Sequence, residues 1–329
     1  MATRNRQLLK KQAAESLAAA PNNPKHILLI HTGVVLLLSL LLTVADFLLK
    51  KAIENTGGLS GLGTRSVLTT VQSLLRLGQM VLLPFWQIGY TFATLKFYRK
   101  EATLPSDLCI GFRRFLPFLR LTLLQALLYL IIGFVSSQAG SFLFMLTPWA
   151  APIMEAITQM LYGGSAQGME NALEALAADA MIPLMVCTAF VFLALSIPFF
   201  YRFRLAQYIL LDDPEGKAWN AMRTSWTWTR GNAVALFRLD FSFWWFYALD
   251  LLSSIIAYAD ALLLAMGVTL PVSEEFAFFS SFILYLLCQL ALYWWRRNEV
   301  STTYAAFYHA AHPAPEAPKP YPSRPFWTA

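Results

Sequence analysis

Long apolar runs alternate with short polar segments along most of this chain. A helix needs about 20 mainly apolar residues to cross the hydrocarbon core of a bilayer, and each run is long enough to do so. The pattern predicts an all-α fold, a polytopic membrane helical bundle of six transmembrane helices. These helices are expected at Ile27–Leu49, Ser66–Phe97, Phe115–Val135, Met181–Tyr201, Phe241–Leu262 and Phe276–Trp295.

Shorter amphipathic helices are predicted before the first, third and fifth spans. In residues 1–26, Leu9 and Ala13 share one helical face among lysines and arginines, which is typical of a helix on an anionic membrane surface. The third such helix should start at Pro214 and end before Gly231, the usual asymmetry of helix ends. Each short helix leads into two spans, so the chain reads either as three similar hairpins or simply as any six-span protein would.

The chain is expected to divide into three parts. Residues 1–26 form the basic amphipathic helix, residues 27–297 the transmembrane domain, and residues 298–329 a Pro-rich tail that is disordered after His312. Within the transmembrane domain, residues 136–180 begin with an apolar stretch that two prolines interrupt. That stretch suits an interfacial or re-entrant element better than a full crossing.

The distribution of charge predicts the orientation. Only 13% of the residues are charged and 57% are hydrophobic, whereas a soluble domain carries about a quarter charged residues. With six spans, 21 of the 25 Lys and Arg residues fall on the side of both termini. By the positive-inside rule, the chain is predicted to be a multi-pass cell-membrane protein with cytoplasmic N- and C-termini. The net charge of +6 follows from this bias, so no nucleic-acid partner is expected.

The sequence holds no signature of an enzyme. Its three cysteines and four histidines form no ligand cluster, and no phosphate loop, zinc-protease motif or nucleophile elbow is complete. We therefore expect no catalytic residue, metal or cofactor, and no enzymatic activity.

Three aspartates lie ten residues apart around the fifth apolar run. A helix rises about 15 Å over ten residues, so Asp240 would sit at the inner interface, Asp250 near the middle of the bilayer and Asp260 at the outer edge. Arg120 is the candidate partner of Asp240, and Arg202, Arg204 and Arg238 share that level. Asp46 and Arg76 share the outer level.

Asp250 has no Lys or Arg at its level, so it is expected to be protonated, hydrogen-bonded to Gln125 or Tyr129, or in contact with a water-filled cavity. The second span carries a polar stripe that has to face other helices or water. The candidate intramembrane polar site is Asp250 with Gln72, Arg76 and Gln79, and the stripe continues through Gln87, Tyr90 and Thr94.

A second group of candidates lies where the fourth span ends and the third amphipathic helix follows. Aromatic and basic side chains together are typical of a membrane interface, where lipid phosphate is the natural counter-ion. Trp219, Met222 and Trp226 are expected to form a lipid-facing stripe. The candidate anchors are Arg202, Arg204, Trp219, Trp226 and Arg230.

Residues 196–247 also resemble a known family. The matching positions include Arg202, Asp212, Pro214 and Gly231-Asn232, and a closing Thr302–Tyr308 segment, TTYAAFY, fits as well. On these residues the chain resembles the bacterial domain of unknown function 975 family of integral membrane proteins. The resemblance implies a membrane fold but no activity. Asp213 stands where that family usually has Asn.

Two functions remain open. The first is a non-enzymatic membrane component that binds anionic lipid or a partner protein through its basic, Trp-rich cytoplasmic face. The second is a small-molecule or peptide permease or export component that uses the polar seam. A permease requires a continuous polar cavity at mid-depth between the second, third and fifth spans, whereas a dry, packed centre with exposed cytoplasmic grooves would favour the first function.

Overall fold

The computed structural model describes residues 5–56, 62–151, 181–259 and 273–312, with positions 154, 155 and 158, and every regular element among them is a helix. The predicted all-α class is therefore confirmed. The elements are α1 (Arg6–Ala18), α2 (Pro24–Asn55), α3 (Leu62–Arg99), η3 (Pro105–Cys109), α4 (Ile110–Arg113), α5 (Phe115–Met145), η4 (Pro148–Ala150), α8 (Met181–Phe203), α9 (Ala206–Asp212), α10 (Ala218–Thr229), α11 (Ala233–Phe241), α12 (Trp244–Ile256), α14 (Glu274–Leu292), η6 (Tyr293–Arg297) and α15 (Asn298–Ala311).

Five long helices in the described ranges are apolar enough to cross a membrane, and a sixth crossing results if α11 and α12 count as one broken span. The two halves of that span meet at 64°. The break falls just after Asp240, where the sequence predicts that a hydrocarbon crossing can begin. The predicted span Phe241–Leu262 corresponds to α12 and the break before it, and Asp260 and Leu262 lie outside the described residues.

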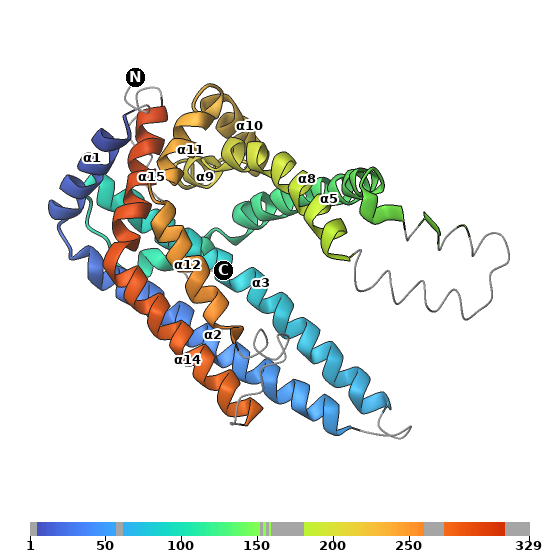
Figure 1. The fold of residues 1–329 in the computed structure, drawn as a ribbon. Coiled ribbons are helices and arrows are strands. Elements are labelled where there is room, and N and C mark those ends of the chain that lie inside the picture. Colours follow the sequence, from blue (N-terminus) through green and yellow to red (C-terminus); the bar gives the residue numbers. More distant parts are fainter. Residues whose placement is uncertain are drawn as a thin grey trace.

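The long helices pack as three hairpins, α2 with α3, α5 with α8, and α12 with α14. This arrangement agrees with the three-hairpin interpretation of the sequence. Figure 1 shows that the α5–α8 hairpin points away from α2, α3 and α14. All three meet at the end of the bundle where α1, α9, α10 and the end of α15 lie, which we call the basic end. Leu77 and Leu127, on two of the diverging helices, are more than half exposed, as lipid-facing side chains should be.

The last helix does not stop at the predicted boundary between residues 297 and 298. It continues from α14 through the π-helical turn η6 into α15, and Thr302–Tyr308 are buried. The residues after His312, for which disorder is predicted, lie outside the described part. The stretch after Val135 also differs from its prediction, because α5 continues to Met145 before the short turn η4.

The N-terminal helix α1 packs on α15 and α3. Its predicted apolar stripe therefore faces protein, with Leu9 and Ala13 buried. Lys10 Nζ lies 3.9 Å from the ring centroid of Phe243 and donates to the carbonyl of Ser242 at 3.2 Å. Burial lowers the pKa of the Lys10 ammonium. The lysine thus ties α1 to the break between α11 and α12.

Two glycines allow backbones to touch near the basic end. A Cβ on Gly89 of α3 would lie 1.8 Å from the carbonyl oxygen of Leu108, and one on Gly111 would lie 2.2 Å from that of Phe85. The η3–α4 turn therefore rests directly on α3. Lys96 and Asp107 seal this contact with a 2.8 Å ion pair.

We predict that Gly89→Ala destabilises the protein by about 2 kcal/mol or more, because the new methyl group meets backbone that cannot move aside. The measurement is the thermal unfolding midpoint in detergent. Gly78→Ala on the same helix is the control, since no atom lies within 4 Å of its added Cβ. Equal midpoints for the two variants would contradict the close contact.

Candidate functional site

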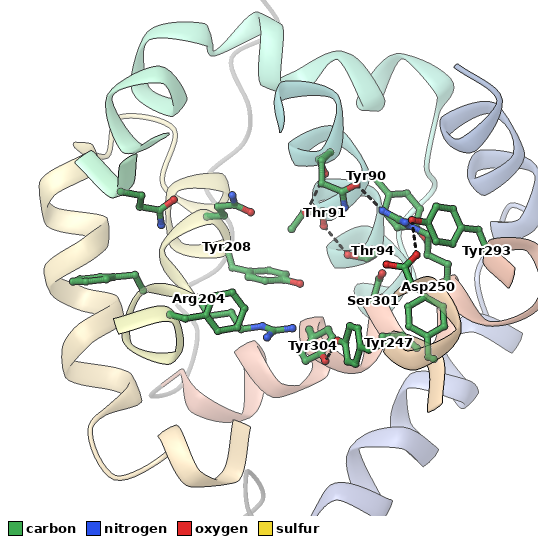
Figure 2. Close-up of a pocket in the computed structure, with 18 of the residues that line it drawn as sticks. Tyr90, Thr91, Thr94, Arg204, Tyr208, Tyr247, Asp250, Tyr293, Ser301 and Tyr304 are labelled. Carbon is green, nitrogen blue, oxygen red and sulfur yellow. Dashed lines mark hydrogen bonds between the residues drawn. The ribbon is translucent and has the colours of Figure 1, made fainter. Parts of the chain in front are cut away.

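A cavity of about 770 Å³ lies where the three hairpins meet (Figure 2). Amide, hydroxyl and charged groups face it together with aromatic rings. Its lining comprises Gln87, Tyr90, Thr91 and Thr94 of α3, Gln125 and Tyr129 of α5, Phe200, Phe203 and Arg204 at the end of α8, Gln207 and Tyr208 of α9, Phe246, Tyr247 and Asp250 of α12, Tyr293 and Arg297 of η6, and Val300, Ser301 and Tyr304 of α15.

Helical spacing brings these groups to the cavity. Gln87, Tyr90 and Thr94 recur three and four residues apart, so they share one face of α3. This confirms that the polar stripe of the second span faces inward at this level. Tyr247 and Asp250 share a face of α12 in the same way. Figure 2 shows Arg204 and Tyr208 reaching in from one side and Asp250 with Tyr293 from the other.

The carboxylate of Asp250 is held by the last helix. Its Oδ1 accepts hydrogen bonds from Gln289 Nε2 at 3.0 Å and from the Tyr293 hydroxyl at 3.2 Å. Gln125 and Tyr129, the predicted partners, line the same cavity but form no hydrogen bond with Asp250 in the described structure. The expectation that Asp250 faces a cavity agrees with the structure.

Arg297 is a second charged group of the cavity. Its Nη2 donates to Gln87 Oε1 at 2.6 Å, and its guanidinium carbon lies 4.1 Å from the Tyr293 ring centroid and 5.3 Å from that of Tyr90. From the sequence, Arg297 looks like the basic end of a membrane anchor. The π-helical turn at Tyr293–Arg297 redirects it inward, and no feature of the local sequence announces that turn.

The third charged group, Arg204, is paired. Its Nη1 lies 2.6 Å from Asp240 Oδ2, and both side chains are less than one-fifth exposed. Tyr201 donates to the same carboxylate at 2.9 Å, and the hydroxyl of Tyr304 donates to its other oxygen. Arg120, the predicted partner of Asp240, is exposed instead. A second cavity, of about 430 Å³, lies behind this pair and shares Phe200, Arg204 and Tyr247 with the first.

A third aspartate closes the basic end. Arg99 of α3 binds both oxygens of Asp212 at 2.7 and 2.6 Å, and Tyr308 donates to it at 2.7 Å. The last helix therefore presents a tyrosine hydroxyl to each of three aspartates, with Tyr293 on Asp250, Tyr304 on Asp240 and Tyr308 on Asp212. Steps of eleven and four residues keep these tyrosines on one helical face.

The rest of the predicted seam lies elsewhere. Gln72 and Arg76 bind Asp46 of α2 at 2.9 and 3.0 Å, which agrees with the shared level expected for Asp46 and Arg76. Neither they nor Gln79 lines the central cavity. The predicted site thus separates into an outer cluster on α2 and α3 and an inner site at Asp250.

The predicted anchor residues also lie in different environments. Trp219 and Arg230 are exposed, and Arg202 stacks on Trp226 at 5.0 Å. Met222 is buried, so it is not part of a lipid-facing stripe, and Arg204 belongs to the cavity wall. The helix of this region begins at Ala218 because Pro214 forms part of the preceding turn, and Gly231 follows its end with a positive φ of 85°.

We predict that Asp240→Asn lowers the free energy of unfolding by about 3 kcal/mol, because Arg204 then remains buried without a counter-charge. Thermal unfolding in detergent measures the effect. Asp213→Asn is the control, since the Asp213 side chain is exposed and accepts only from a nearby backbone amide in the described structure. The pairing would be refuted if both variants unfolded like the wild type.

The comparisons with known proteins place the chain in a family. No curated protein and no solved structure matches the chain. A family model described as "Protein of unknown function (DUF975)" matches residues 4–311, from α1 to the end of α15. The match includes the Asp212 and Thr302–Tyr308 positions that the structure joins. The chain therefore belongs to the DUF975 family of proteins of unknown function.

Proposed function

We propose that this protein is a non-enzymatic permease or export component that binds a small polar solute in its central cavity. Residues of α3, α5 and α12, the second, third and fifth spans, line the cavity together with residues of α8, α9 and the last helix, and this shared polar lining supports the proposal. Its volume falls within the roughly 300–1,000 Å³ of small-molecule sites. Polar side chains inside a membrane bundle typically face a partner or an aqueous pathway, and here they face a common space.

The arrangement of the hairpins supports movement of a solute. Alternating access in many transporters consists of one helix bundle rocking against another around a fixed site. The α5–α8 hairpin diverges from α2, α3 and α14 (Figure 1), and residues of α3, α5, α8 and α12 line the cavity. We propose further that the basic end faces the cytoplasm of a cell membrane, because it carries most of the lysines and arginines.

Filling the cavity should abolish transport. We predict that Gln125→Trp removes uptake of any transported solute, because the indole occupies space that the solute needs. Proteoliposomes are incubated with a defined mixture of small polar metabolites, and their contents are measured by mass spectrometry. Gln79→Trp is the matched control, since Gln79 lies outside the cavity. The proposal fails if wild-type, Gln125→Trp and protein-free vesicles retain the same solutes in the same amounts.

The exposed tryptophan and arginines of α10 favour a second candidate function, the binding of anionic lipid. Trp219 is 64% exposed, and Arg223 and Arg230 are exposed near it on the same helix and at its end. An indole beside guanidinium groups suits lipid headgroups at an interface.

If α10 binds lipid, the Trp219→Ala/Arg230→Ala double variant should retain several-fold less anionic lipid than the wild type. Native mass spectrometry of protein purified in mild detergent counts the bound lipids. Trp149→Ala, which removes an exposed Trp from η4, is the control. Unchanged phosphatidylglycerol binding in the double variant would exclude this role.

A further inference from the structure

The central cavity holds two charges that the described structure does not pair. Arg204 has Asp240, but Arg297 has no carboxylate within 4.0 Å and Asp250 has no cation within 4.0 Å among the described residues. Uncompensated charges are costly inside a membrane bundle, and they usually mark a substrate or ion site. The two unpaired groups are of opposite sign.

The carboxylate of Asp250 can accept further hydrogen bonds. Both of its protein hydrogen bonds go to Oδ1, from Gln289 and Tyr293, and the described side chains supply none to Oδ2. Phe246 and Tyr247 of the same helix also line the cavity. A carboxylate beside aromatic rings is a suitable site for an ammonium group, since the ring faces attract cations as well.

The guanidinium of Arg297 is also held in place, and it too keeps hydrogen-bonding capacity that the described residues do not use. Gln87 accepts from its Nη2, and its buried Nε has no hydrogen-bond acceptor among the described residues. The ring of Tyr293 lies under the guanidinium and that of Tyr90 close to it, so its plane is restrained. A planar fork of donors held in place is the preferred site for a carboxylate or phosphate.

One tyrosine lies between the two groups. The hydroxyl of Tyr293 donates to Asp250, while the face of its ring carries Arg297. A single small molecule can therefore reach both charges. The aspartate and the arginine do not approach each other closely enough to form an ion pair themselves.

We propose that the cavity binds a small zwitterion, with its ammonium group at Asp250 and its carboxylate or phosphate at Arg297. The proposal rests on the proposed function in that it names the class of solute that the same cavity takes. The required chemistry occurs both in free amino acids and in the headgroup of phosphatidylethanolamine.

The test uses the purified full-length protein in nonionic detergent, with binding measured by isothermal titration calorimetry. The probes are the twenty protein amino acids, tested singly, and dihexanoyl phosphatidylethanolamine. For each zwitterion that binds, an amine-only and an acid-only analogue follow. Binding of free amino acids alone identifies a soluble ligand, and binding of the short-chain lipid alone identifies a headgroup.

Asp250→Asn should weaken the zwitterion and the amine-only analogue about tenfold or more, while the acid-only analogue binds as before. Arg297→Gln should weaken the zwitterion and the acid-only analogue about tenfold or more, while the amine-only analogue binds as before. Both substitutions keep a hydrogen-bonding group, and unfolding midpoints without ligand check that the bundle is intact. Asp46→Asn, an aspartate of α2 outside the cavity, should leave all three affinities unchanged.

The proposal is overturned if no zwitterion binds, or if Asp250→Asn and Arg297→Gln bind zwitterions as the wild type does. Loss of both analogues in both variants would also overturn it, because the two charges would then not act separately. These failures leave the proposed function standing if proteoliposomes still take up another solute. Conversely, zwitterion binding without uptake would refute the proposed transport, while the proposal of a zwitterion-binding site would stand.

Discussion

Three tyrosine hydroxyls on the last helix hold this bundle together by binding three aspartates on other elements. Asp212 ends α9, Asp240 lies near the end of α11, and Asp250 lies in the middle of α12. A carboxylate that is largely removed from water needs donors from the protein, and all three aspartates are partly buried. Because these donors come from one helix face, the position of that helix fixes the positions of the other three elements.

The arginines complete the same arrangement and divide its roles. Arg99 and Arg204 neutralise Asp212 and Asp240, so the charge at these two positions is compensated within the protein. Asp250 receives only neutral donors in the described structure. Structural charges are thus paired and lie toward the basic end, whereas the unpaired aspartate lies deeper and faces the cavity. All three aspartates are partly buried, so pairing with an arginine, and not burial, separates the two structural aspartates from the one proposed to bind a ligand.

The sequence determines the spans but not how they meet. Apolar length and helical period are local properties, and they placed each predicted span on an observed helix, although α5 continues to Met145 and the last helix continues to Ala311. Partner choice is not local: Asp240 pairs with Arg204 and not with Arg120 because α11 packs on α8, at whose end Arg204 lies. The buried face of α15 and the inward turn of Arg297 were missed for the same reason. The Tyr- and Thr-rich segment Thr302–Tyr308 can be recognised in the sequence, but Asp212, the partner of Tyr308, lies 96 residues earlier in the chain.

The late position of α15 in the chain has a consequence for biogenesis. Its buried segment, Thr302–Tyr308, packs against α1 and α3, which leave the ribosome far earlier. Until the last turn is made, Leu9 and the carboxylates of Asp212 and Asp240 lack their final covering and donors. The contacts among the earlier helices are therefore expected to be completed only when α15 docks, after the rest of the chain has been made.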